Sequence, residues 1–260
     1  MAYDLHTHTN WCDGKNTPEE VVLSAIDKGL TTIGVLAHSY CDFEPEYFLH
    51  YSKIDAFIEE INRLKEKYSS KIKVLCGVEQ DTFSSPLAKT KGFDYILGSV
   101  HNFKVGDKYY PMDFTEEILV GYVNEVFNGN IYDAIDNYFE SVSEIVERTN
   151  ANIIGHFDLI KKFNIDGKLF DENHPRYISA WKKAVDKLIP YGVPFEINIG
   201  GLIRVRGQDK PYPSNQIMEY IKSKGGKFIY GSDSHVANTV GSYFEDWKDK
   251  VIYEVRNNKL

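Results

Sequence analysis

The chain has 260 residues, of which 42% are hydrophobic and 26% charged, and its formal net charge is −8. This length suits one large α/β domain, and because no linker or repeat stands out, we expect a single domain over residues 1–260. The acidic balance, without a long lysine or arginine run, argues against a nucleic-acid partner.

The sequence also predicts a cytoplasmic protein without a membrane partner. No apolar run approaches the roughly 18–20 residues of a membrane span. The N-terminal segment lacks the basic flank and apolar core of a signal peptide. The cysteines Cys12, Cys41 and Cys76 are odd in number and widely spaced, which is typical of reduced thiols.

Short apolar runs alternate with helical patterns along the chain. A strand over 3–8 precedes a helix over 17–29, in which Thr17 is the N-cap, Pro18 takes the first position and Gly29 stops the helix. The other predicted strands are 31–38, 71–79, 93–101, 152–158, 193–198 and 227–233. The other predicted helices are 52–68, 115–127, 131–149, 175–190, 214–224 and 240–249.

Strands that alternate with helices favour a parallel sheet, because each return to the sheet crosses through a helix. Apolar runs of this kind suit strands that are buried on both faces. We therefore expect an α/β fold, a distorted TIM-like (βα)7 barrel with its active site at the C-terminal ends of the strands. An open doubly wound sheet is the alternative.

Histidines and carboxylates gather at the predicted C-terminal ends of the strands. Six of the eight histidines fall there, whereas His50 and His174 lie in loops or helix approaches and are interpreted as structural. In a parallel barrel these ends converge on one mouth. The converging residues are His6, His8, His38, Glu79, His101, His156, Asp233 and His235. The sixth strand carries no obvious ligand and ends with Asn198.

This convergence indicates a metal site. His6 and His8 lie two apart on one strand, so both point to the same face, about 6–7 Å apart along the strand. With Glu79 and Asp233 they form a nitrogen and oxygen donor set that suits Zn, Mn or Fe. The donors are too many for one ion, so we expect two or three divalent ions that share a carboxylate. Such a centre implies hydrolysis by metal-bound hydroxide, and phosphate monoesters need stabilisation of that strength.

The motifs 'DLHTHT', 'GVE', 'SVHN', 'GHFDLIKKFN' and 'GSDSH' resemble, in order and spacing, the PHP (polymerase and histidinol phosphatase) family. 'SVHN' followed by 'PMDF' and 'AIDNYFESV' is similar to its histidinol-phosphate phosphatase branch. The resemblance spans the chain from Asp4 to at least His235. It implies a (βα)7 barrel that hydrolyses L-histidinol phosphate to L-histidinol and phosphate, a step of histidine biosynthesis.

The resemblance also implies a trinuclear site with a definite ligand distribution. The first metal takes His6, His8, Glu79 and Asp233, the second Glu79, His101 and His156, and the third Asp13, His38 and His235. Asp13 lies in 'CDG', where the alternative interpretation is a turn residue before a helix cap. The sequence departs from many relatives at Ala37, where they carry an acidic residue just before the second-strand histidine.

Several further side chains are candidates for substrate contact and catalysis. Arg204, Arg206 or Lys161 could bind the phosphate through charge-assisted hydrogen bonds. The loop after the sixth strand borders the mouth, which favours the two arginines, although a solvated cation is the alternative.

Four other residues complete the prediction. Asp158 follows His156 by two and could orient a ligand histidine or act as an acid and base on the leaving alkoxide. Asp113 and Phe114 are candidates for recognition of the imidazole or ammonium end of the substrate, and Asn198 for a further substrate contact.

Three other functions stay open at this point. The chain could be another PHP-type phosphoesterase that acts on phosphotyrosine, nucleotides or sugar phosphates. It could be an amidohydrolase-type deacetylase, which also begins with His-x-His, or a metal-holding barrel without activity. The predicted partner is a small phosphorylated substrate, and the sequence does not indicate the oligomeric state.

Overall fold

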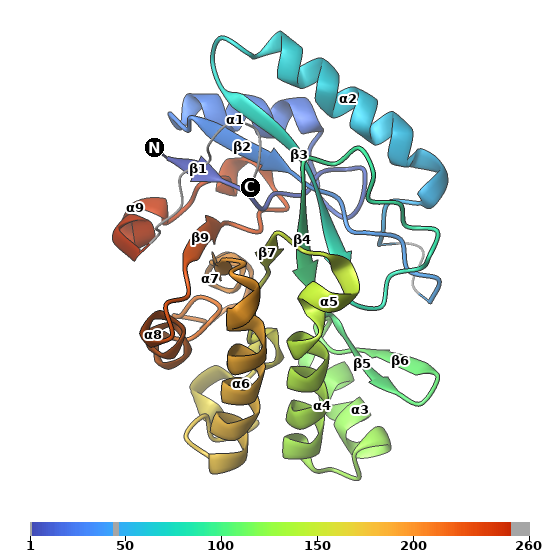
Figure 1. The fold of residues 1–260 in the computed structure, drawn as a ribbon, viewed down its shortest axis with the longest axis vertical. Helices are drawn as coiled ribbons and strands as arrows, with labels where there is room; N and C mark the ends of the chain where they lie inside the picture. The colour runs from blue at the N-terminus through green and yellow to red at the C-terminus, as the bar shows by residue number, and fades with distance from the viewer. Residues whose placement is uncertain (1, 44–46, 251–260) are drawn as a thin grey trace.

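The computed structural model describes residues 2–43 and 47–250, in which seven parallel strands form one sheet in the order β1-β2-β3-β4-β7-β8-β9 (Figure 1). The strands are β1 (Tyr3–Asp4), β2 (Thr32–Val35), β3 (Lys73–Asp81), β4 (Tyr95–Ser99), β7 (Ile153–Ile154), β8 (Phe195–Asn198) and β9 (Phe228–Gly231). A parallel bridge between Thr7 and Ser234 joins the segments that follow the two outer strands. The sheet is therefore a nearly closed barrel, and the predicted distorted TIM-like fold is confirmed.

Helices cover the outside of this sheet. The helices are α1 (Pro18–Asp27), α2 (Ile54–Lys67), α3 (Glu116–Val126), α4 (Ile131–Ser143), α5 (Ile145–Thr149), α6 (Pro175–Leu188), α7 (Gly200–Arg204), α8 (Asn215–Ser223) and α9 (Phe244–Trp247). Figure 1 shows α1 and α2 on the side of β1 to β3, and α4 beside α6 below the strands β4 and β7. None of the helices within the described residues combines the length and apolar content needed to cross a membrane.

Local signals in the sequence placed some boundaries correctly. The side chain of Thr17 accepts a hydrogen bond from the backbone N–H of Glu20, whose carboxylate accepts one from the N–H of Thr17, so α1 begins with a capping box. His50 and His174 accept hydrogen bonds from backbone N–H groups at the starts of the short helix Tyr51–Lys53 and of α6. Their structural interpretation is confirmed.

Other boundaries differ from the predicted ones because tertiary contacts decide them. The predicted helix 131–149 breaks at Glu144, and Ile145 at the start of α5 then packs onto Gly98 of β4, where a Cβ would lie 2.3 Å from the Ile145 side chain. An antiparallel hairpin of β5 (Asn102–Val105) and β6 (Lys108–Pro111) follows β4 and was not predicted. The final predicted helix, 240–249, is only the short α9 followed by Lys248–Lys250.

The barrel interior is filled by side chains, among them the fully buried ring of Tyr95. Tyr95 projects from β4 and donates a hydrogen bond from its hydroxyl to the carbonyl of Leu5 at 2.6 Å. Gly34 and Gly77 make room for this ring, since a Cβ there would lie 2.0 Å and 2.5 Å from Tyr95 atoms. The interior below the mouth is thus packed and solid, which leaves the C-terminal ends of the strands as the place for a site.

Candidate metal centre

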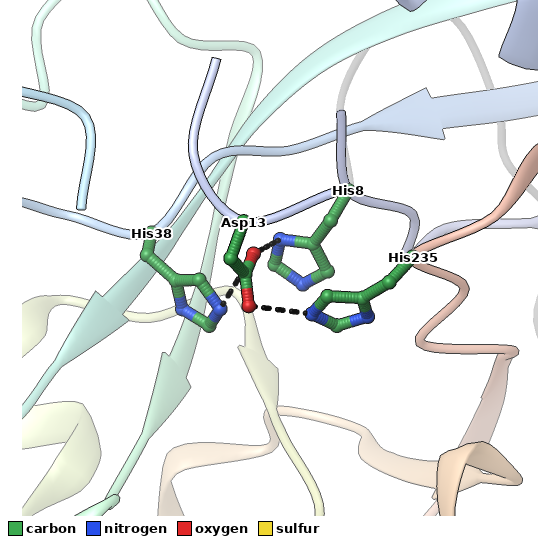
Figure 2. Close-up of side chains that lie close together, drawn as sticks. All are labelled: His8, Asp13, His38 and His235. Atoms are coloured by element: carbon green, nitrogen blue, oxygen red, sulfur yellow. Dashed lines mark hydrogen bonds and ion pairs between the residues drawn. The ribbon is translucent and has the colours of Figure 1, made fainter. Parts of the chain in front are cut away.

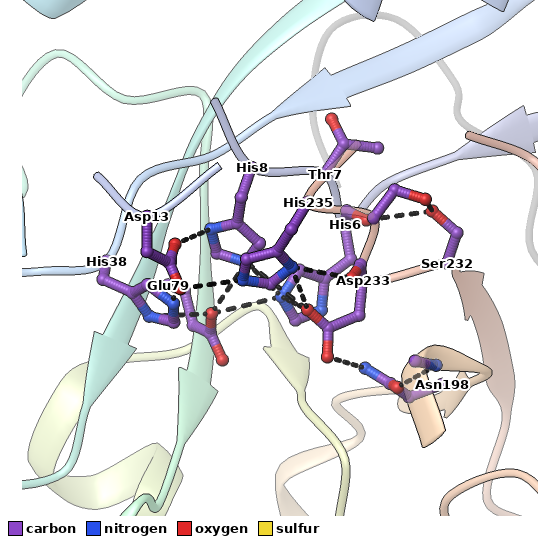
Figure 3. Close-up of polar contacts among 12 residues, drawn as sticks. His6, Thr7, His8, Asp13, His38, Glu79, Asn198, Ser232, Asp233 and His235 are labelled. Carbon is purple, nitrogen blue, oxygen red and sulfur yellow. Dashed lines mark hydrogen bonds and ion pairs between the residues drawn. The ribbon is translucent and has the colours of Figure 1, made fainter. Parts of the chain in front are cut away.

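The strand ends bring all nine sequence-predicted ligands together at the mouth of the barrel. Figure 3 labels all of them except His101 and His156. The nine residues are His6, His8, Asp13, His38, Glu79, His101, His156, Asp233 and His235. Several of them line a cavity of about 350 Å³. Segments that are far apart in sequence meet there because all the strands of the barrel are parallel.

Glu79, near the end of β3, is the centre of this cluster and is only 1% exposed. Its Oε2 lies 3.1 Å from Nε2 of His6, 3.2 Å from Nε2 of His8 and 3.1 Å from Nδ1 of His38. One carboxylate oxygen therefore faces three imidazole nitrogens.

The other oxygen of Glu79 faces a second group. Its Oε1 lies 2.9 Å from Nε2 of His156 and 3.2 Å from Nε2 of His101, and it accepts a hydrogen bond from the hydroxyl of Ser99. A carboxylate with ring nitrogens at both oxygens has the geometry of a bridge between two cations.

The spacing of the donor atoms fits metal coordination. Tetrahedral ligands with bonds of about 2.0–2.1 Å lie roughly 3.3 Å from one another. The Nε2 atoms of His6 and His8 are 3.0 Å apart, and each lies 3.6 Å from Oδ1 of Asp233. Burial, together with the charges of neighbouring histidines, lowers the pKa of His8 to about 3, which leaves its ring neutral and able to coordinate.

A further donor group surrounds Asp13, as Figure 2 shows. Oδ2 of Asp13 lies 2.9 Å from Nε2 of His235, whereas Oδ1 lies 3.6 Å from Nε2 of His38 and 3.9 Å from Nδ1 of His8. Oδ1 is buried and accepts no hydrogen bond from the described residues. A buried carboxylate oxygen without a donor, surrounded by imidazoles, suits a cation.

The electrostatics of the cluster favour positive charge at its centre. Burial lowers the pKa of His6, but the carboxylates Glu196, Glu79 and Asp233 outweigh this effect and raise that pKa well above its usual value. Burial raises the pKa of Asp233, but the charges of Arg204 and His6 lower it well below its usual range. The site thus stabilises a bound proton or, equally, a cation in its place.

Asp158 and Lys161 do not border this cavity, contrary to prediction. After His156 the chain turns into the short helix Leu159–Lys161, so the face of the strand does not continue. Asp158 is fully buried and accepts a hydrogen bond from the N–H of Ser214 at 3.0 Å. Lys161 lies 3.5 Å from Asp158 and donates to the carbonyl of Pro211. Asp158 and Lys161 therefore form a buried ion pair, and their hydrogen bonds hold the loop 211–214 in position.

The two candidate arginines also separate. The unpredicted helix α7 ends at Arg204 and directs it to the mouth, where Nη2 lies 2.7 Å from Oδ2 of Asp233 and Nη1 contacts His235. Arg206 lies beyond the helix end, is exposed and does not line the cavity. Asn198 is fully buried behind Asp233, so its placement does not support the predicted substrate contact.

Asp113 and Phe114 line the outer wall of the cavity, together with two residues that sequence reasoning did not select. Lys162 lies 3.2 Å from Oδ2 of Asp113, and the ring of Tyr47 lies 5.0 Å from that of Phe114. Burial raises the pKa of Asp113, but Lys162 and then His101 lower it below its usual value. This wall offers an ionised carboxylate, an ammonium and two aromatic rings.

Two buried carboxylates that touch the ligand histidines were also missed. Asp81 accepts a hydrogen bond from Nδ1 of His101 at 3.0 Å, and Glu196 accepts one from Nδ1 of His6 at 2.7 Å. Their sequence signal was an acidic residue inside an apolar strand, in 'GVEQD' and 'VPFEIN'.

Comparisons with known proteins agree with this geometry. The PHP domain family model matches residues 4–200. A Schizosaccharomyces pombe protein named probable histidinol-phosphatase is 26% identical over 265 residues, covering 93% of this chain and 83% of that protein.

Two solved structures share the fold. A Listeria monocytogenes protein gives a TM-score of 0.80 at 21% identity, over 94% of this chain and 99% of that one. The histidinol phosphate phosphatase of Lactococcus lactis, solved with zinc, L-histidinol and phosphate, gives 0.66 at 21% identity, over 91% and 87%. Because the family model spans more than half of its residues, this chain belongs to the PHP domain family.

Proposed function

We propose that this chain is a metal-dependent phosphatase that hydrolyses L-histidinol phosphate to L-histidinol and phosphate. The observation that carries the proposal is the cluster of nine buried or half-buried imidazoles and carboxylates with Glu79 at its centre. The name of the Schizosaccharomyces pombe relative and the ligands of the Lactococcus lactis structure support the same substrate.

The donor groups suit two or three divalent ions, with Zn, Mn and Fe as candidates. His6, His8, Glu79 and Asp233 would hold the first, and Glu79 would extend to a second with His101 and His156. Asp13, His38 and His235 would hold the third, and His8 lies close enough to contribute. When bound, such ions activate water as a nucleophile and neutralise charge on a phosphoryl group.

The chain's own side chains do the remaining work. Arg204 borders the cavity with its side chain about a third exposed, where it can bind phosphate oxygens by charge-assisted hydrogen bonds. Lys162 adds a second cation to the lining of the cavity. Asp113 would accept hydrogen bonds from the substrate ammonium, and Phe114 would pack against its imidazole.

A substrate panel tests this function. The purified chain, reconstituted with Mn²⁺ or Zn²⁺, should hydrolyse histidinol phosphate far faster than p-nitrophenyl phosphate, nucleoside monophosphates, phosphotyrosine or sugar phosphates. Comparable rates across the panel would instead support a different PHP-type phosphoesterase. Deacetylase activity without phosphatase activity would favour the amidohydrolase alternative, and metal binding without any turnover would favour a non-catalytic barrel.

A further inference from the structure

One buried carboxylate beneath the donor cluster has no part in the predicted ligand sets. Glu196 lies on β8, the strand that delivers no predicted ligand, and it is fully buried. Its Oε1 lies 2.7 Å from Nδ1 of His6. A proton on Nδ1 would be donated to this carboxylate oxygen, which would leave the lone pair of the neutral ring on Nε2. That Nε2 is the atom that faces His8 and Glu79.

The second oxygen of Glu196 reaches two more parts of the cluster. Oε2 accepts hydrogen bonds from the backbone N–H of His156 at 2.9 Å and from Nδ2 of Asn198 at 3.0 Å. The same Nδ2 lies 3.3 Å from Oδ2 of Asp233. One carboxylate thus connects ligands that come from three separate strand ends, namely His6, His156 and, through Asn198, Asp233.

The neighbouring strand leaves space for this carboxylate. Gly231 ends β9 beside it, and a Cβ at that position would lie 1.9 Å from Oε1 of Glu196 and 2.7 Å from Cβ of His6. Any larger residue would displace either the carboxylate or the histidine. The contact between Glu196 and His6 therefore requires a glycine at position 231.

We propose that Glu196 is a positioning residue that fixes the tautomer and orientation of His6 and the placement of His156 and Asp233. It would thereby set how tightly the centre holds its metal. Outer partners of ligand histidines typically change metal affinity or activity by about 10–100-fold when they are removed. This inference rests on the metal centre of the proposed function, and it gives a role to β8, the strand that carries none of the predicted ligands.

The test compares Glu196→Gln with the unsubstituted chain. Glutamine keeps the size of the side chain and one acceptor oxygen but removes the charge. Its NH₂ group would face one of the N–H groups that now donate to Glu196. Asp94→Asn is the control for a carboxylate remote from the mouth. Asp94 accepts the backbone N–H of Cys76 at 2.7 Å, pairs with Lys65 and lies just before β4, at the opposite end of the barrel. Glu196→Asp, which keeps the charge but shortens the side chain, serves as a second variant.

Zinc retention is measured by competition with a chromophoric chelator, and the Co²⁺-loaded proteins are compared by visible absorption. We expect Glu196→Gln to hold zinc about 10–100-fold more weakly and to change the Co²⁺ bands, with a smaller loss in Glu196→Asp and none in Asp94→Asn. The thermal midpoints of the metal-free proteins are measured alongside, to show which variants are folded.

The outcomes separate this inference from the proposed function. If the wild-type chain retains no metal, the proposed function fails and this inference fails with it. If the wild type binds zinc and a folded Glu196 variant binds it equally well with an unchanged Co²⁺ spectrum, only this inference is overturned. Should Glu196→Gln not fold, Glu196→Asp decides by the same two measurements.

Discussion

The sharpest prediction concerns how the cavity selects its substrate. Asp113 lies on the outer wall, 20% exposed and paired with Lys162, and its lowered pKa keeps it ionised at neutral pH. In the proposed function this carboxylate accepts a hydrogen bond from the substrate ammonium. Asp113→Asn keeps the shape and the acceptor oxygen but removes the charge.

The expected magnitude follows from that single contact. A hydrogen bond to a charged group contributes about 1.5–3 kcal/mol, and each 1.4 kcal/mol corresponds to about a tenfold change. The kcat/KM for histidinol phosphate should therefore fall by roughly 10–150-fold. For p-nitrophenyl phosphate, which lacks an ammonium group, kcat/KM should change by less than about threefold.

The assay measures kcat/KM for both substrates on the same metal-loaded preparations. Asp107→Asn, which removes an exposed carboxylate from the turn of the neighbouring hairpin, is the control and should leave both values unchanged. Equal losses for both substrates in Asp113→Asn would mean that Asp113 supports the site as a whole, and the assigned contact with the ammonium would be refuted.

Four further predictions can be checked directly. Chelation of the metals should abolish phosphatase activity and lower the thermal midpoint, because ions that bind only the folded chain stabilise it. Addition of Zn²⁺ or Mn²⁺ should restore both the activity and the thermal midpoint. Full activity after exhaustive chelation would contradict the proposed metal site. Glu79→Gln should reduce bound metal more than Asp13→Asn, because Glu79 faces two donor groups and Asp13 one, and elemental analysis measures the difference. Arg204→Ala should raise KM for the phosphate ester by about tenfold or more, whereas Arg206→Ala should leave it unchanged, and a reversed order would show that the wrong arginine was chosen. Finally, hydrogen bonds from a lysine, a tyrosine and an arginine at α2 lower the pKa of Glu19 to about 2. This carboxylate should therefore stabilise the fold fully above about pH 4.5 and progressively less as the pH falls towards 2. In urea unfolding of the metal-free protein, Glu19→Gln should lower the free energy of unfolding by about 1 kcal/mol at pH 7 and by little at pH 2.5, and an equal loss at both pH values would contradict this.

Much of the candidate site was predictable because it depends on local order along the chain. The alternation of strands and helices implies parallel strands, and parallel strands end at one mouth. A histidine at a strand end, such as His38 or His101, could therefore be assigned to the cluster without knowledge of any contact. The start of α1 was predictable for a similar reason, since Thr17 and Glu20 cap the helix within a single turn.

Residues whose role depends on what happens beyond a strand end were harder to predict. Asp158 shares a sequence spacing with His156, but the chain leaves the strand direction and buries it in another ion pair. Arg204 and Arg206 look equivalent in sequence, and only the short helix α7 directs one of them into the cavity.

The sequence by itself determined the parallel strands and most of the donors at their ends, because the period of a strand and the need for crossovers are properties of short segments. It left an open sheet as the alternative to a barrel, and the bridge between Thr7 and Ser234 in the structure decides this point. Only the tertiary structure decided which oxygen of Glu79 faces which imidazoles, and that Glu196 supports His6 from below. The contacts of Glu79 with His6 and His156, and that of Glu196 with His6, join residues more than seventy positions apart. Their distances depend on how the seven strands are staggered around the barrel. A stagger of this kind is set by the packing of the whole core, which no single segment encodes.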